Sequence, residues 1–337
     1  MSAGRWLRAA LGATLLGALL VPVPAANAGN DDEGEALLVA ARTATSNETF
    51  AGVVEVRWRD DDGDLHVERV GARSLNGRFV VGVGDYQVVG RGFERVTTGA
   101  GEADAHWSAG AHHRAPRPGA AWQLDITGHH RIAGRRATEI SARDAEGRVR
   151  ARFYVDAAHD QLLGREVLDP DGRVARSVRF VKIVTGSLTP AVPGVPSDGS
   201  ERAPRSVDDV SGGYVAPAVV GRGYRLLGRY EHDDGVVQLY YSDGLFSLSV
   251  FEQPGAVDWS ALPRGESAHI GGLRARAFTT AVGTVVVWGD RDLVLTAVGD
   301  GPRDAVIGVV ARLSGSPDQS DWFDDVVDFV LDPFSWF

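Results

Sequence analysis

Hydrophobic and polar residues alternate along much of the chain, and the alternation is clearest from Arg131 to Ile183. Within residues 149–155, for example, Val, Ala, Phe and Val alternate with Arg, Arg and Tyr, so an extended chain has one polar and one apolar side. Clusters of Asp, Gly and Pro of hairpin length separate the runs at residues 144–147, 156–160 and 169–172. The stretch predicts four sequential antiparallel strands, whose apolar side needs a cover of helices, a second sheet or an apolar ligand.

The residues before this stretch predict a helix and more strands of the same kind. Residues 33–45 place Leu37, Leu38, Ala40 and Ala41 on one helical face. Strands are expected at 50–58, 65–72, 78–83, 86–90, 93–97 and 123–127, and a long polar loop at 99–119. The predicted first domain, residues 30–184, is therefore one helix and about nine strands, and its fold class is mainly β (α+β). We expect a curved, incompletely closed antiparallel sheet with helical cover.

The inner face of such a sheet is the candidate ligand-binding cavity. Trp107 lies within the long loop, where a lone indole either docks on its own domain or forms a lid over an apolar cleft. The candidate cavity residues are Val54, Val56, Trp58, Val80, Trp107, Phe153 and Phe180.

The composition changes at residues 185–213, which are rich in Pro, Gly, Ser and Asp and predict a semi-extended linker. Alternation returns in a smaller predicted antiparallel β domain, residues 214–315, with strands at 236–241, 246–252, 274–279, 283–288 and 293–297. A helix at 302–313 closes it. Two β domains on a Pro-rich tether predict a cleft of variable width between them, and domain interfaces are common ligand sites.

The last segment, residues 316–337, predicts an acidic amphipathic helix. Asp321, Asp324, Asp325, Asp328 and Asp332 fall on one helical stripe, and apolar residues cover the rest. An anionic membrane surface repels such a helix. Docking on its own domain, capture by a protein partner and fraying remain open alternatives.

Charge, cysteine content and the first residues limit the class of protein. The 337 residues carry a net charge of −10 and no basic run, which disfavours nucleic-acid binding, and no cysteine, which removes thiol catalysis, disulfides and thiolate metal sites. Residues 1–28 have two arginines, an apolar stretch and a small-residue cleavage pattern ending at Ala28. They predict a cleaved signal peptide, so the mature chain is expected to be exported, extracytoplasmic and not inserted in the membrane.

No catalytic motif is present among the patterns that we considered, which include GxSxG, HExxH and the P-loop. The pairs His112-His113 and His129-His130 point to opposite faces of an extended chain, so neither predicts a metal site. We therefore expect no cofactor, no metal and no enzymatic activity, and a binding function by elimination.

Two motifs carry a resemblance to a known family. The first is the order of Gly-Arg-Arg-Ala at 134–137, an aromatic strand ending in Asp156, and Leu-Leu-x-Arg-Glu at 162–166; the second is the run from Tyr241 to Phe251. With these motifs the chain resembles the MucB/RseB family of secreted regulators of envelope-stress sigma factors. The resemblance covers residues 35–315 and implies a lipoprotein-carrier-like N-terminal domain.

The resemblance also implies a function. A C-terminal domain would bind the extracytoplasmic part of a single-span anti-sigma factor and shield it from proteolysis, and a lipidic or envelope-derived signal would release it. The alternative is a lipid or lipoprotein carrier of the cell envelope that uses the same cavity. Candidate partner-binding residues are the apolar positions of the second motif, Tyr241, Phe246, Leu248 and Phe251.

Overall fold

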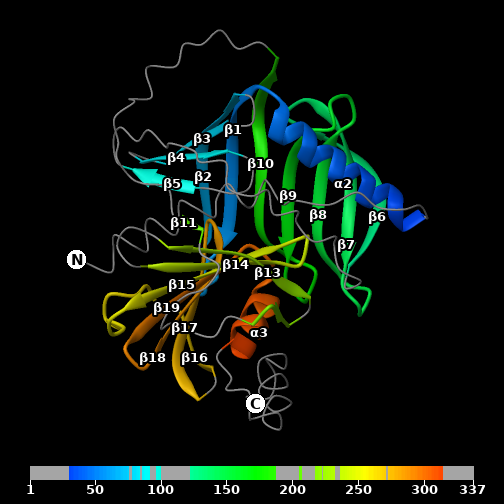
Figure 1. Cartoon of the computed structure of the whole chain (residues 1–337). Coiled ribbons are helices and arrows are strands. Elements are labelled where there is room, and N and C mark those ends of the chain that lie inside the picture. The colour runs from blue at the N-terminus through cyan, green and yellow to red at the C-terminus, as the bar shows by residue number, and fades with distance from the viewer. Residues whose placement is uncertain are drawn as a thin grey trace.

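The computed structural model of the protein describes residues 30–75, 78–83, 86–91, 96–99, 122–186, 205–206, 217–221, 223–231, 236–270 and 272–313. Within them lie two antiparallel sheets, each with an open strand order, and two helices (Figure 1). The expected fold class, mainly β with an incompletely closed sheet and few helices, is confirmed. None of the described helices is long and apolar enough to cross a membrane.

The first sheet has ten strands in the order β5-β4-β3-β2-β1-β10-β9-β8-β7-β6. The four sequential strands expected from the central alternation are β7 to β10, and their turns close as the Asp and Gly clusters predicted: the Gly147 and Gly172 amides bond to the Asp144 and Asp169 carbonyls at 2.9 and 3.0 Å. The strands are β1 (Phe50–Arg59), β2 (Leu65–Leu75), β3 (Arg78–Val83), β4 (Tyr86–Arg91), β5 (Val96–Gly99), β6 (Gln123–Ile132), β7 (Arg135–Arg143), β8 (Val149–Asp156), β9 (Leu162–Leu168) and β10 (Val174–Thr185).

The second sheet has nine strands, with the path β11-β13-β14-β15-β19-β18-β17-β16 and β12 paired to β13. β12, β13 and β16 were not predicted, and Arg205–Ser206, within the predicted linker, form β11 at the edge of this sheet. The other strands are β12 (Val219–Val220), β13 (Tyr224–Glu231), β14 (Val237–Ser242), β15 (Ser247–Pro254), β16 (Glu266–Ile270), β17 (Leu273–Thr280), β18 (Gly283–Asp290) and β19 (Leu293–Gly299).

The helices cover parts of the two sheets. α2 (Asn30–Asn47) starts with a run of acidic residues, which suits a helix N-terminus, and it crosses β6, β8 and β9, where Leu38 and Ala41 are buried (Figure 1). α3 (Arg303–Leu313) follows Pro302 and packs on β18, β19 and β12. It matches the predicted closing helix.

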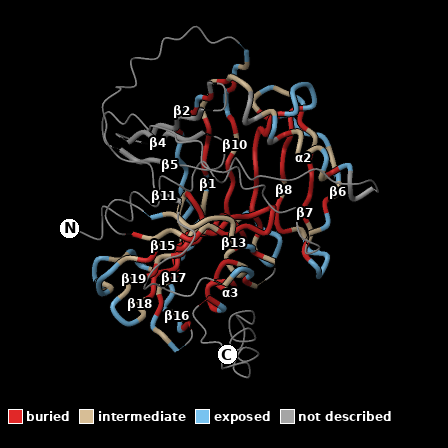
Figure 2. Tube along the Cα trace, viewed as in Figure 1, coloured by how far each residue is buried: buried red, intermediate tan, exposed pale blue. Residues whose placement is uncertain are grey.

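The apolar core is continuous between the sheets. One cluster of buried residues joins Phe153 of β8 to Phe246, which precedes β15, and a second joins Val56 of β1 to Val285 of β18. Figure 2 shows this buried band where the second sheet meets the first. The described parts therefore pack directly on each other, and the cleft expected between two tethered domains is filled there by side chains.

Candidate functional site

The two faces of the first sheet carry different residues. Leu124, Ile140 and Phe153 belong to the same buried cluster as the α2 residues Leu38 and Ala41. Neighbours along a strand point to opposite faces, so Asp125, Glu139 and Tyr154 belong to the other side. We call that side the polar face. Strand pairing extends it across the sheet, because Tyr154 pairs with Gly164, Gly164 with Arg179, and Arg179 with Glu55.

On the polar face, buried carboxylates lie beneath exposed guanidinium groups. Arg57 and Arg69 donate from their Nε atoms to the two oxygens of Glu55, at 2.7 and 2.8 Å. The Glu55 side chain is 8% exposed, whereas those of Arg57 and Arg69 are 53% and 67% exposed. The surface that a ligand meets is therefore mainly cationic, even though acids and bases alternate along the sheet. The hydrogen bonds from Arg69 and then Arg57 lower the pKa of Glu55, so that carboxylate stays ionised.

A second group of the same kind surrounds Glu166 on β9. Glu166 pairs with Arg179, accepts a hydrogen bond from Arg152 at 3.3 Å, and accepts one from the Tyr154 hydroxyl at 3.0 Å. The Arg179 guanidinium also lies over the Tyr154 ring, 4.8 Å from its centroid. Burial, and next the Glu166 charge, raise the pKa of Tyr154, so its phenol stays neutral and a donor.

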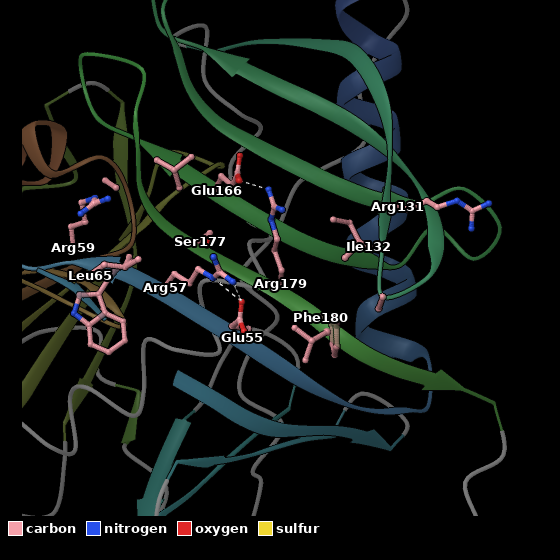
Figure 3. A pocket seen from close by; sticks show the side chains of 15 residues that line it. Glu55, Arg57, Arg59, Leu65, Arg131, Ile132, Glu166, Ser177, Arg179 and Phe180 are labelled. Atoms are coloured by element: carbon pink, nitrogen blue, oxygen red, sulfur yellow. Dashed lines mark hydrogen bonds and ion pairs between the residues drawn. The ribbon is translucent and has the colours of Figure 1, made fainter. Parts of the chain in front are cut away.

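The polar face holds a pocket of about 530 Å³ between these two groups (Figure 3). Its size is within the range of small-molecule sites. The lining combines arginines with apolar side chains, of which Leu65, Val174 and Val181 are substantially exposed. We call it the arginine pocket; it is lined by Glu55, Arg57, Trp58, Arg59, Leu65, Arg131, Ile132, Ala133, Glu166, Val174, Ala175, Ser177, Arg179, Phe180 and Val181.

The β6–β7 hairpin tip supplies one wall of the pocket. Its two-residue turn, Ala133-Gly134, has φ of 50° and 80°, the left-handed pair that a tight hairpin with the natural strand twist needs. Arg135, just after the turn, reaches Asp156 at 2.6 Å and the Thr185 hydroxyl at 2.9 Å. Arg135 thereby ties the tip to the end of β10. Figure 3 shows Arg131 and Ile132 at one end of the pocket, and Arg59 and Leu65 at the other.

The opposite face of the same strands meets the second sheet through buried arginines. Arg165 of β9 donates to the Asp300 carboxylate at 2.8 Å and to the Asp300 carbonyl at 3.2 Å. Arg176 of β10 bonds to the same carbonyl at 2.6 Å and to the Val282 carbonyl. Both members of the Arg165–Asp300 pair are at most 1% exposed. We call this region, with Trp122, Asp243 and Phe246, the junction.

Phe246 is enclosed within the junction. The centroids of the Trp122 and Phe246 rings are 5.1 Å apart in an edge-on arrangement, and the Arg165 guanidinium lies 4.7 Å from the Phe246 centroid. The Trp122 indole N–H also donates to the Asp243 carboxylate at 2.9 Å. Asp243 accepts from the Leu245 and Phe246 amides as well, at 2.8 and 2.7 Å. Burial raises its pKa to about 6 despite these bonds.

The junction and the arginine pocket lie back to back on one layer of strands. Arg165 and Glu166 are adjacent on β9, and Arg176 and Ser177 are adjacent on β10. In each pair the first residue enters the junction and the second lines the pocket.

The structure separates the predicted cavity residues. Trp58 and Phe180 line the arginine pocket, while Val54, Val56 and Phe153 are buried in the core. Val80 lies on β3, whose side chains are outside the described residues, and Trp107 is also outside them. A ligand role for this set stays a prediction.

The predicted partner-binding residues are almost all in the interior. Tyr241 and Phe246 are 0% exposed and Leu248 is 1% exposed, while Phe251 is half-buried. Their apolar character reflects packing within β14, β15 and the junction. Contact with a partner stays a prediction, and for the first three residues it requires the protein interior to open.

Sequence reasoning did not find the arginines of the pocket. Alternating arginines are typical of the solvated side of a strand. Only the pairing of β1 with β10 and the approach of β6 to β10 bring these arginines to one place. Among the described residues, no group of three or more His, Asp or Glu is arranged to hold a metal ion.

The fold combines an open antiparallel sheet crossed by a helix with a smaller antiparallel sheet closed by a second helix. Among solved structures, the crystal structure of MucB matches 83% of this chain and 97% of its own, with a TM-score of 0.51 and 20% identity. The complex of Pseudomonas aeruginosa MucA/MucB matches 84% of this chain and 98% of that chain, with a TM-score of 0.47 and 19% identity.

A LolA superfamily protein from Nitrosomonas europaea matches 46% of this chain and 94% of its own, with a TM-score of 0.20 and 10% identity. No family model and no curated protein matches the sequence. The resemblance to MucB expected from the two motifs is thus confirmed at the level of the fold.

Proposed function

We propose that the protein is an exported regulator that binds the extracytoplasmic domain of a single-span anti-sigma factor, shields it from proteolysis and so keeps a sigma factor inactive. The observation that carries the proposal is the fold shared with MucB over 83% of this chain. The first sheet and α2 span less than half of the chain, so a match of that extent includes both sheets. MucB itself has been solved in complex with MucA(peri).

We also propose that a lipidic or envelope-derived signal releases the anti-sigma factor, and the arginine pocket supports this part of the proposal. An amphiphile with an acidic headgroup suits a site in which exposed arginines and exposed apolar side chains share one lining. The acidic net charge of the chain gives no general attraction for anions, so affinity for such a ligand has to come from this local cluster.

The test is protection of a defined partner. The purified mature chain is mixed with the external domain of a single-span anti-sigma protein from the same organism, and digestion of that domain by a protease is followed. We expect a stable complex and slower digestion. Absence of both binding and protection, for every such domain the organism encodes, contradicts the proposal.

The second candidate is a carrier of lipids or lipoproteins, and the same pocket favours it. A carrier retains acidic amphiphiles through purification and passes them to acceptor vesicles, with no stable protein partner. A regulator binds the anti-sigma domain and releases it when the amphiphile is added. Mass spectrometry of the purified protein, together with the protection assay, separates the two functions.

A further inference from the structure

The arginine pocket exposes apolar and cationic groups that a complementary segment would cover. Leu65 and Val181 are 52% and 41% exposed. Arg59 and Arg131 are exposed too, and within the described part of the chain each donates only to a turn carbonyl, of Gly63 at 3.0 Å and of Gly134 at 3.2 Å. Arg59 and Arg131 therefore have charges that no carboxylate among these contacts neutralises, whereas the arginines bound to Glu55 and Glu166 are already paired.

The chain carries a segment of matching chemistry after its last described residue. Residues 314–337 contain six aspartates and no lysine or arginine. They also contain six aromatic residues, listed as Trp322, Phe323, Phe329, Phe334, Trp336 and Phe337. Acidic and aromatic groups in one short segment are what a pocket lined by arginines and apolar side chains accommodates.

The segment begins close enough to reach the pocket. Arg303, at the start of α3, contacts Asp61 at 3.2 Å, and Asp61 belongs to the turn between the pocket residues Arg59 and Leu65. α3 has 11 residues and is therefore ~16 Å long. The seven residues 314–320 span up to ~24 Å when extended, so Asp321 can return past the start of α3 to this end of the pocket.

We propose that residues 321–337 dock in the arginine pocket of the same chain, with aspartates against Arg59 and Arg131 and aromatic side chains on its apolar lining. The tail then acts as a built-in competitor for any acidic amphiphile. This goes beyond the proposed function and does not rest on it, because docking is measured on the chain alone, without partner or lipid.

Cross-linking of the full mature chain tests the proposal, because the absence of native cysteines leaves any introduced pair unambiguous. One variant combines Ser335→Cys in the tail with Val181→Cys in the pocket. Its matched control combines Ser335→Cys with Val219→Cys, a 54% exposed valine of β12. The control is stringent because Gly221, two residues on, lies against Val309 and Arg312 near the end of α3, where an undocked tail is close.

With a short bis-maleimide reagent, we expect intramolecular cross-linking at Val181→Cys to be faster than at Val219→Cys. Adding Arg59→Ser and Arg131→Ser should slow it about three- to tenfold, the effect of losing two exposed ion pairs, and high salt should act in the same direction. A second variant changes the tail and leaves the pocket intact. It carries Asp324→Asn, Asp325→Asn and Asp328→Asn, and its cross-linking at Val181→Cys should be slowed by a similar factor. Circular dichroism confirms that each variant is folded.

Three results overturn the proposal. Cross-linking at Val219→Cys that equals or exceeds that at Val181→Cys shows a tail that does not prefer the pocket. Only intermolecular products show docking on a second copy. A rate that is unchanged by both the arginine and the aspartate substitutions shows contact without the proposed charge recognition. None of these results bears on binding of an anti-sigma domain, so the proposed function is tested separately.

Discussion

At the scale of single residues, the most unusual feature is the use of arginine in the interior. Arg176 is fully buried, and burial, followed by the neighbouring Arg165, lowers its pKa to about 10. A guanidinium remains protonated under such conditions and needs acceptors. The Asp300 and Val282 carbonyls accept from Arg176, and the Asp300 carboxylate accepts from Arg165. The two buried arginines therefore join the first sheet to the segment after β19 and to the turn between β17 and β18.

Removal of one partner of the buried pair should be costly. We expect Arg165→Met to lower the free energy of unfolding by about 3–5 kcal/mol, because Asp300 loses its cation in a buried site. The matched control is Arg173→Met, whose pair with Asp171 joins side chains that are 80% and 67% exposed and should change stability by less than ~1 kcal/mol. Urea titration measures both, and equal effects would contradict this account of the junction.

Asp243 should make stability depend on pH. Its folded pKa of about 6 lies above its ordinary value of 3.8, so the folded state binds this proton more tightly than the unfolded state. The resulting stabilisation is complete below about pH 4 and is lost as the pH rises through 6, a change on the order of 3 kcal/mol. The difference in free energy of unfolding between the wild type and Asp243→Asn, measured from pH 4 to 7.5, should show this decline. A difference that does not vary with pH would refute it.

At the scale of elements, two helical glycines with different surroundings allow the effect of packing to be distinguished from that of helix propensity. A Cβ on Gly34 of α2 would lie 2.7 Å from the Leu124 carbonyl oxygen of β6, whereas a Cβ on Gly308 of α3 would meet nothing within 4 Å. At Gly34, α2 thus lies close to the backbone of β6. Such a contact fixes the height of the helix above the strands.

Alanine substitutions at the two glycines should therefore have opposite signs. Gly308→Ala should stabilise the protein by about 0.5–1 kcal/mol, because alanine is the better helix former. Gly34→Ala should destabilise it by about 1–3 kcal/mol, because the gain in propensity is smaller than the cost of displacing α2 from β6. Thermal unfolding of the two variants provides the comparison. Stabilisation by both would show that α2 moves without cost.

The elements that sequence predicted correctly are those with strong local signals. Period-two alternation between Asp and Gly turns located β7 to β10, and Pro302 with an apolar stripe located α3. β16 was missed because it is short and polar. β13 was missed because two adjacent leucines and Gly228 interrupt its alternation. The arginine pocket was beyond sequence reasoning for a different reason. Its residues come from β1, β2, β6, β9 and β10, and only non-local contacts bring them together.

At the scale of the whole molecule, the shared core suggests that the described parts of the two sheets unfold together. Two clusters of buried residues each contain side chains from both sheets, and the buried arginines of the first sheet bond to the second. The sequence indicated two domains and a linker, but not this contact, because an apolar strand such as 246–251 looks the same whether it faces a partner or another part of its own chain.

Calorimetry should show one transition for the mature chain. The van't Hoff enthalpy should equal the calorimetric enthalpy, because neither sheet can leave without exposing the common core. Arg165→Met should shift that single transition to lower temperature. Two resolved transitions in the wild type, with only one sensitive to this substitution, would show instead that the sheets are independent folding units.

The back-to-back placement of the pocket and the junction has a practical consequence for kinetics. A ligand can bind in the arginine pocket and dissociate from it while Arg165 stays hydrogen-bonded to Asp300. Its exchange rate is therefore not limited by separation of the two sheets. Yet Arg165 and Glu166 share a peptide group, as do Arg176 and Ser177. Deuterium uptake at these few amides of β9 and β10 therefore reports on both surfaces of the strand layer in a single measurement.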